Sequence, residues 1–158
     1  MLTKEVRQAV ESISEIKRYL NEQHDLFLAM PAGLPVKGPI SSPFGFRKHP
    51  QTGEHGFHYG IDISIAARTP VRATADGIVS FSGQTNGSGN ILVVEHGFGL
   101  NTAYAHNTEN LVKVGKRVKR GDVIVTSGAT GVTTGPHVHY EVWKDGKQVD
   151  PLSFMKER

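Results

Sequence analysis

Glycine-containing turns interrupt this chain from residue 83 onward and restrict what it can fold into. They lie at 83–89, 97–99, 115, 121, 128–135 and 145–146. After residue 30 no segment has the length and periodicity of a helix. Short strands separated by such turns are typical of an all-β sandwich or barrel. We therefore predict strands at 61–65, 71–82, 90–96, 100–106, 122–127 and 137–143.

The first 30 residues follow a different period. Val6, Ile13, Leu20 and Phe27 recur every seven residues between charged neighbours, which predicts one amphipathic helix. Thr3 suits the N-cap position of that helix. The apolar stripe either packs on the chain's own domain or forms the end of a longer coiled coil.

Four prolines between residues 30 and 43 exclude a helix there. We therefore divide the chain into an N-terminal helix at 1–30, a Pro-rich connector at 31–43 and a main domain at 44–158. The predicted fold class is mainly β, a compact antiparallel sandwich or barrel-like domain preceded by one N-terminal α-helix. A length of 158 residues fits one ordinary domain with a small appendage.

The composition limits which targeting segments, metal ligands and partners the chain can have. No stretch approaches the ~20 apolar residues of a membrane helix, and residues 1–30 lack the apolar core of a signal peptide. Any targeting or anchoring segment is therefore expected upstream of Met1. The chain has no cysteine, which leaves histidine and carboxylate as ligands for a metal site. Residues 31–158 hold fourteen basic and ten acidic residues, which favours an anionic partner such as a cell-wall polymer; no nucleic-acid-binding motif accompanies them.

Five residues are of the types that form the active site of a metal-dependent hydrolase: His58, Asp62, His106, His137 and His139. Such an enzyme needs nitrogen and carboxylate ligands around one metal, an open fourth position and a proton acceptor beside it. On a strand, His137 and His139 would point to the same face about 7 Å apart, so both can share one site without both binding the metal. Taken singly, each motif also fits a polar loop, a strand-end histidine or a surface pair.

The order of these motifs, with the sequence around them, resembles one known family. The segment from Phe44 to Pro151 is similar to the lysostaphin-type zinc metalloendopeptidases, which cut peptidoglycan cross-links. The resemblance covers about two thirds of the chain. Its densest blocks are Phe-Gly-Phe-Arg-Lys-His-Pro at 44–50, Ala-Asp-Gly-Ile-Val at 75–79, Tyr-Ala-His at 104–106, Val-Lys-Arg-Gly-Asp at 118–122 and Thr-Thr-Gly-Pro-His-Val-His-Tyr-Glu at 133–141.

The resemblance implies a role for each of the five residues. His58, Asp62 and His139 match the family's zinc ligands, for one Zn²⁺ per chain, whereas His106 and His137 match its two catalytic histidines. Departures are mild: Asn107, Thr133 and Val138 stand where Leu, Ser and Leu are usual. No departure removes a ligand.

The function implied is a zinc-dependent endopeptidase that hydrolyses stem or cross-link peptides of peptidoglycan with a metal-activated water. Its expected location is the cell envelope: the periplasm, the outer face of the inner membrane or outside the cell. The expected partner is peptidoglycan, and nucleic acid is not expected to bind. A membrane anchor or a coiled-coil partner is expected upstream of this sequence.

Three other interpretations compete with an active enzyme. The first is a catalytically silent module that binds peptidoglycan and activates other wall hydrolases, although the chain keeps all five site positions. The second is a carrier domain, suggested by residues 114–124 but lacking the modifiable lysine motif. The third is a latent enzyme whose N-terminal helix and connector dock across the groove. The glycine-rich loops at 83–89 and 128–135 are candidates for the groove walls or simple hairpin turns.

Overall fold

The computed structural model describes residues 1–49 and 52–155 and confirms the predicted fold class, a mainly β domain preceded by one α-helix. Helix α1 spans Lys4–Ala29, and the Thr3 side chain accepts a hydrogen bond from the Val6 N–H at 3.3 Å, as expected of an N-cap. Pro50 of the 44–50 motif and the last three residues of the 44–158 domain lie outside the described residues.

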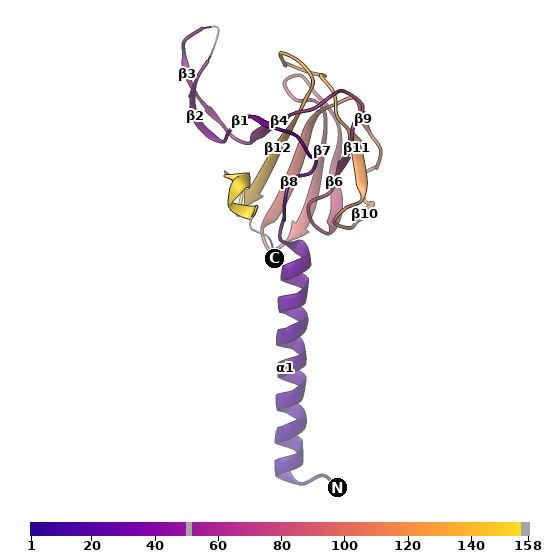
Figure 1. Cartoon of the computed structure of the whole chain (residues 1–158). Coiled ribbons are helices and arrows are strands. Elements are labelled where there is room, and N and C mark those ends of the chain that lie inside the picture. The colour runs from indigo at the N-terminus through magenta and orange to yellow at the C-terminus, as the bar shows by residue number, and fades with distance from the viewer. Residues whose placement is uncertain (50–51, 156–158) are drawn as a thin grey trace.

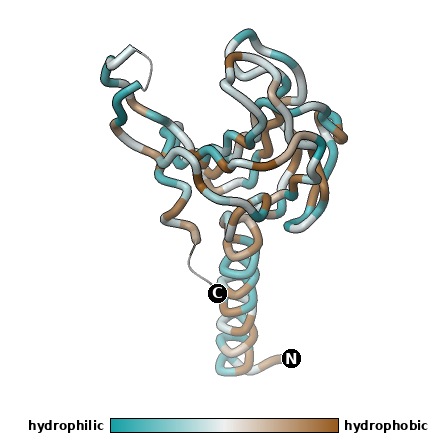
Figure 2. The backbone as a smooth tube through the Cα atoms, turned by 45° about the horizontal axis from the view of Figure 1, so that its top comes forward, coloured by the Kyte–Doolittle hydropathy of each residue, from teal (hydrophilic) through white to brown (hydrophobic). Residues whose placement is uncertain are grey.

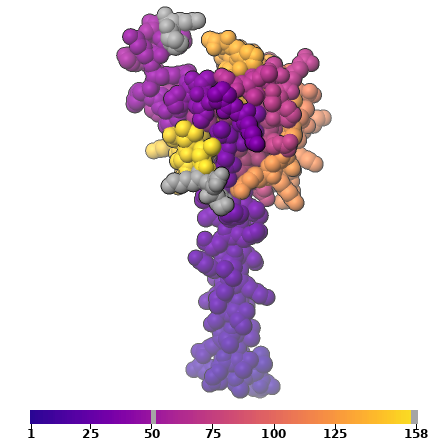
Figure 3. All heavy atoms as spheres, viewed as in Figure 1, coloured from indigo at the N-terminus to yellow at the C-terminus, as the bar shows by residue number. Residues whose placement is uncertain are grey.

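Helix α1 projects from the β domain as a free-standing stalk (Figures 1 and 3). Every residue up to Asp25 is exposed, and the stripe residues Ile13 and Leu20 are 55% and 58% exposed. Brown segments recur along the helix in Figure 2, where they mark this stripe. Only the last turn meets the domain: Arg120 donates to the Met30 carbonyl at 3.0 Å, and its guanidinium lies 5.8 Å from the Phe27 ring centre. The coiled-coil assignment stays a prediction.

The β domain consists of one large sheet, one small sheet and a projecting hairpin. In the large sheet the strands follow the order β1-β4-β12-β8-β7-β6-β10, with β13 paired to β12; the small sheet has the order β5-β11-β9, and β2 pairs with β3. All these pairs are antiparallel. The bounds are β1 (Ile40–Ser42), β2 (Gly45–Lys48), β3 (His55–His58), β4 (Ile61–Ser64), β5 (Pro70–Arg72), β6 (Gly77–Thr85), β7 (Gly89–Gly97), β8 (Leu100–Asn107), β9 (Glu109–Asn110), β10 (Arg117–Val118), β11 (Val123–Thr126), β12 (His137–Lys144) and β13 (Lys147–Val149), followed by the 3-10 turn η1 (Pro151–Phe154).

One predicted strand is wrong. The segment 71–82 divides into β5 and β6, which belong to different sheets. Gly77 opens β6 where the backbone passes so close to β7 that an added Cβ would lie 2.4 Å from the Glu95 carbonyl oxygen. The predicted strand is therefore interrupted before Gly77, and residues 73–76 connect the small sheet to the large one.

The strands that the sequence did not predict are short. β2, β3, β9, β10 and β13 have two to four residues and no sustained alternation. β1 lies inside the Pro-rich connector and pairs with β4, while Leu34 and Val36 of the same segment pack against the core. In the described part of the chain, no helix is long and apolar enough to cross a membrane.

The hydrophobic core lies between the large and small sheets. Ile61 and Ile63 of β4 and Val138 of β12 are fully buried there, facing Val71 and Val125 of the small sheet. Because side chains alternate along a strand, the residues between these core positions point to the opposite face. This alternation places the side chains of Asp62, His137 and His139 on the outer face of the large sheet.

The core also contains a satisfied polar cluster. The Tyr104 and Tyr140 hydroxyls are fully buried, and both reach the Thr74 hydroxyl, at 3.3 Å and 2.7 Å. Burial raises the pKa of both tyrosines, so they remain neutral hydrogen-bonding groups. These two strands, β8 and β12, are thereby braced directly beneath the histidines that they carry.

We predict that Ile63→Ala lowers the free energy of unfolding by about 2–5 kcal/mol, because it leaves a cavity in a closed core. Ile78→Ala is the matched control, since this strand isoleucine is 41% exposed. Denaturant titration of both variants, with chelator present, measures the difference. Equal losses for the two would contradict the placement of the core.

Candidate metal centre

The strand register brings residues from three parts of the sequence together on the outer face of the large sheet. His139 lies opposite Asp62 of β4 and, on its other side, opposite Ala105 of β8, one residue before His106. His58 ends β3, which returns to β4 through Gly60. An added Cβ at Gly60 would lie 2.5 Å from the Tyr140 carbonyl oxygen, so glycine permits β3 to approach β12 this closely.

Three candidate ligand atoms converge on this face. His58 Nε2 lies 3.2 Å from Asp62 Oδ1, His139 Nδ1 lies 2.8 Å from the same oxygen, and the two ring nitrogens are 3.2 Å apart. Ligands at about 2.0–2.1 Å from a tetrahedral zinc ion stand roughly 3.3 Å from one another. The three atoms therefore fit one face of a zinc tetrahedron, and these three residues form the candidate metal group of the structure.

The second nitrogen of each ligand histidine is fixed by a hydrogen bond. His58 Nδ1 donates to the Pro43 carbonyl at 2.9 Å, and His139 Nε2 donates to Glu141 Oε1 at 2.9 Å. These partners set the tautomers and leave His58 Nε2 and His139 Nδ1 as the ligand atoms. Glu141 in turn accepts a hydrogen bond from Trp143 Nε1 at 2.7 Å.

Sequence reasoning assigned no role to Glu141. The signal was present, because Glu141 follows His139 by two residues on a strand and therefore shares its face. A carboxylate at this position supports a metal-binding imidazole from behind and raises its basicity.

His106 and His137 stand beside the three ligands. Their ring centres are 4.8 Å apart, and His137 Nε2 lies 3.7 Å from Asp62 Oδ1. His106 Nδ1 donates to the Thr130 carbonyl and His137 Nδ1 to the Gly135 carbonyl, both at 2.8 Å. In both rings Nδ1 is used by a backbone carbonyl, which leaves Nε2 for chemistry.

His106 adopts a left-handed backbone conformation with φ 63°. This region is uncommon for residues other than glycine and is held here by the backbone around it. The His106 N–H donates to the Ser88 carbonyl at 2.8 Å, and its carbonyl accepts from the Thr130 N–H at 3.4 Å. The strand end is thus clamped between the loops at 83–89 and 128–135, and the His106 side chain turns toward His137.

The pKa values of His139 and His106 shift in opposite directions. For Asp62, burial raises the pKa, but hydrogen bonds from His139 and His58 outweigh it and hold the pKa well below its usual range. For His139, burial lowers the pKa, but Asp62 and Glu141 outweigh it and raise the pKa to about 9. Burial lowers the pKa of His106, so this imidazole is neutral near pH 7. A metal ion must therefore displace a proton from His139 but not from His106.

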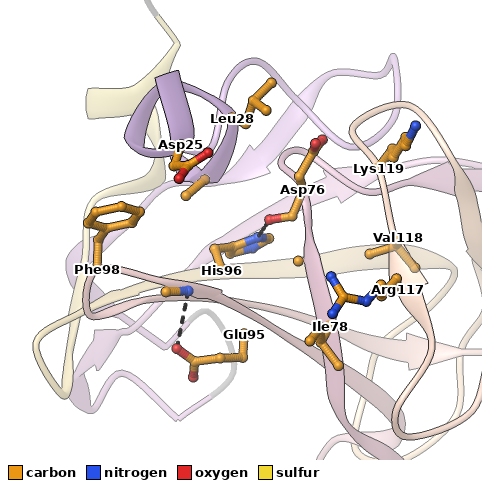
Figure 4. Close-up of a pocket in the computed structure, with 13 residues that line it drawn as sticks. Asp25, Leu28, Asp76, Ile78, Glu95, His96, Phe98, Arg117, Val118 and Lys119 are labelled. Carbon is orange, nitrogen blue, oxygen red and sulfur yellow. Dashed lines mark hydrogen bonds between the residues drawn. The ribbon is translucent and has the colours of Figure 1, made fainter. Parts of the chain in front are cut away.

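All five residues singled out from the sequence meet at this site, whereas His24, His49, His55 and His96 do not belong to it. His96 lines a separate hollow of about 550 Å³, where α1 meets β6 and β7 (Figure 4). Its ring nitrogens contact the Asp76 carbonyl at 2.6 Å and the Thr102 hydroxyl at 2.8 Å. These contacts account for His96 as a structural residue.

A hollow of about 510 Å³ adjoins the centre between hairpin β2–β3 and the loop after Gly128, and Figure 3 shows the notch between them. Thr134 and Gly135 line it, so the 128–135 loop is one of its walls. Among the described lining residues none comes from 83–89; instead the Gly87 carbonyl accepts from the Val132 N–H at 2.9 Å and supports that wall. Helix α1 lies at the other end of the domain and does not cover the hollow (Figure 1).

The comparisons with known proteins agree with this geometry. The model of Peptidase family M23 matches residues 56–151. The chain is 41% identical over 140 residues to an uncharacterized metalloprotease of Haemophilus influenzae, which covers 86% of this chain and 30% of that protein. It is 45% identical over 114 residues to the DD-carboxypeptidase/endopeptidase Mpg of Neisseria meningitidis, which covers 72% and 26%. The chain thus spans less than a third of the length of these curated relatives.

Solved structures show the same fold. A zinc-containing peptidase from Vibrio cholerae superposes with a TM-score of 0.74 at 40% identity, over 82% of this chain and 40% of that one. The catalytic domain of lysostaphin from Staphylococcus simulans gives 0.68 at 32% identity, over 76% of this chain and 93% of that domain. The part of this chain that matches therefore corresponds to nearly the whole of that catalytic domain.

We expect Glu141→Gln to weaken zinc binding by about 10–100-fold, because the amide supports His139 less well than the carboxylate does. Glu95→Gln on β7 is the matched control, because the Glu95 carboxylate accepts from the Gly97 N–H and lies outside the ligand group. Competition with a fluorescent zinc chelator measures both. Equal zinc affinity in the two variants would contradict a supporting role for Glu141 at the site.

Zinc binding at pH 7 is expected to release about one proton from His139. The pKa of this residue is about 9 before the metal binds, so apparent affinity rises with pH and levels off above pH 9. Calorimetry in buffers of different ionisation enthalpy counts the proton. Glu141→Gln removes one cause of the raised pKa and should shift the levelling-off to lower pH; affinity that does not change between pH 7 and 9 would contradict the assignment.

Proposed function

This chain belongs to peptidase family M23, and we propose that it is a zinc-dependent endopeptidase that hydrolyses peptide bonds in peptidoglycan. The observation that carries the proposal is the meeting of His58 Nε2, Asp62 Oδ1 and His139 Nδ1 within 3.2 Å of one another, beside two further histidines. Three relatives from Vibrio cholerae, 40–43% identical to this chain, are peptidoglycan DD-endopeptidases, which supports the choice of substrate.

In this proposal His58, Asp62 and His139 hold one zinc ion per chain. A bound zinc ion supplies Lewis acidity, which polarises the scissile carbonyl and brings the pKa of water to about 7. Asp62 presents Oδ1 to the ligand group, and its other oxygen, Oδ2, faces Arg47 at 3.9 Å. Glu141 and the Pro43 carbonyl keep the two imidazoles in the orientation that binding requires.

His106 is the proposed proton acceptor. Its Nδ1 proton is held by the Thr130 carbonyl, and burial keeps the ring neutral, so Nε2 has a lone pair for the proton of the attacking water. As the C–N bond breaks, the same nitrogen returns that proton to the departing amine. His137, whose Nε2 is not engaged by the backbone, is the residue proposed to steady the oxyanion of the tetrahedral intermediate.

The rest of the predicted organisation follows this proposal. An enzyme of this kind acts in the cell envelope, on peptidoglycan, and takes no part in nucleic-acid binding. We retain the division at 1–30, 31–43 and 44–158 and the assignment of α1 to the end of a coiled coil, which its exposed heptad stripe supports. All five residues needed for turnover share one site, which argues against the alternative of a silent activator.

We predict that His58→Ala and Asp62→Ala lose the zinc, whereas His106→Ala and His137→Ala retain about one zinc per chain and no longer digest purified sacculi. Removing a ligand empties the site, while removing a flanking histidine leaves the ligand group intact. Metal analysis and sacculus digestion, with products identified by mass spectrometry, separate the two classes.

His55→Ala is the control for these four variants, because His55 is exposed on β3 and lies outside the ligand group. It should keep both zinc and activity. Wild-type protein that purifies without zinc and cannot be reloaded would contradict the proposal, and zinc-loaded wild-type protein that leaves sacculi intact would favour the silent activator.

A further inference from the structure

Thr130 meets the strand end that carries His106 through three polar atoms. Its carbonyl accepts a hydrogen bond from His106 Nδ1 at 2.8 Å, and its N–H donates to the His106 carbonyl at 3.4 Å. Its hydroxyl donates to the carbonyl of the next residue, Asn107, at 2.7 Å. Thr130 is therefore bonded to the backbone of the same strand end whose imidazole its carbonyl holds.

Asn90 closes this contact from the facing strand, β7. Its N–H donates to the Thr130 hydroxyl at 3.0 Å, so this hydroxyl both accepts and donates a hydrogen bond. The Asn90 side-chain amide donates to the Asn107 carbonyl, also at 3.0 Å. Thr130 and Asn90 thus form a clasp around the end of β8, in which the Asn107 carbonyl accepts from both residues.

Gly89 allows the two loops of this clasp to come so close. A Cβ added at this position would lie 2.4 Å from the Thr130 hydroxyl oxygen, and φ of Gly89 is 63°. Glycine adopts this left-handed conformation at no steric cost. A side chain at residue 89 would therefore push Thr130 away from the strand end.

Hydrogen bonds, rather than packing, hold the Thr130 carbonyl in place. The residues on either side of Thr130, Ala129 and Gly131, are exposed. This carbonyl keeps the ring proton of His106 on Nδ1 and so leaves Nε2 bare for the proton of water. Because a misplacement of roughly 1 Å can cost about 100-fold in rate, the position of this carbonyl matters to the reaction.

We propose that the Thr130 hydroxyl, held by Asn90, positions His106 for proton transfer. The hydroxyl ties the Thr130 backbone to Asn107, so the acceptor carbonyl and the histidine keep a fixed relation to each other. Thr130 is a positioning residue, since it acts on the reaction through the His106 ring. The inference rests on the proposed peptidase function, within which it assigns this role.

The kinetic test removes the hydroxyl and keeps the shape of the side chain. Zinc-loaded Thr130→Val should lose about tenfold or more in kcat on soluble cross-linked fragments of peptidoglycan. Its KM and zinc content should stay at the wild-type values, because the ligand group and the hollow beside it are unchanged. Thr130→Ser, which retains the hydroxyl, should recover most of kcat.

Thr69→Val is the matched control for these variants. Thr69 is a half-buried loop threonine like Thr130, and its hydroxyl donates to the Ala66 carbonyl at 2.6 Å, in the loop between β4 and β5. It should keep the wild-type kcat. The positioning role is overturned if Thr130→Val keeps the wild-type kcat, if Thr130→Ser is as slow as Thr130→Val, or if Thr69→Val is equally slow.

The ring of His106 gives a second readout that needs no turnover. Nitrogen-15 NMR of the zinc-loaded wild-type protein should show this ring protonated at Nδ1 alone, with a proton that exchanges slowly with water. Thr130→Val should speed this exchange by about tenfold or more, whereas Thr69→Val should not change it. A wild-type ring protonated at Nε2 would overturn the proposal even if Thr130→Val does not fold, and so would an exchange rate that Thr130→Val leaves unchanged.

Failure of the clasp and failure of the peptidase are distinguishable. An active wild-type enzyme whose kcat survives Thr130→Val overturns the positioning role and leaves the peptidase intact. Zinc-loaded wild-type protein that cleaves no peptidoglycan overturns the peptidase and the role of Thr130 with it.

Discussion

The pairing of β12 with β4 is the constraint on which the site depends. This register places His139 opposite Asp62, and strand alternation buries Ile61, Ile63, Val138 and Tyr140 on the other side. A slip of one residue would turn the ligands into the core and the core residues into solvent. Burial of this apolar face therefore fixes which side chains of the two strands face the candidate metal centre.

Around that pairing, hydrogen bonds to backbone carbonyls orient three of the four imidazoles. The Pro43, Thr130 and Gly135 carbonyls accept from His58, His106 and His137, whereas His139 alone relies on a carboxylate, Glu141. A carbonyl orients a ring without adding charge, but Glu141 raises the pKa of its partner as well. The two carboxylates beside His139 thus raise its pKa, whereas burial lowers the pKa of His106.

The sequence was sufficient to single out the five residues that the fold brings together, because His58, Asp62, His106, His137 and His139 stand in motifs whose order is distinctive. The long strands were also predictable from apolar alternation between glycine turns. The hairpin β2–β3 and the division of 71–82 were not, because short strands leave no periodic signal and a glycine inside an apolar run fits either a strand or a break. Glu141 gained its role only from the fold, which brings the outer face of β12 against the candidate ligands.

The most direct measurement of the central claim is a crystal structure of the zinc-loaded protein with anomalous data at the zinc edge. The account predicts one strong peak per chain, about 2.0–2.1 Å from His58 Nε2, one Asp62 oxygen and His139 Nδ1, with His106 and His137 outside bonding distance. A peak bonded to His106 or His137 in place of one of these three, or zinc held elsewhere on the chain, would contradict it.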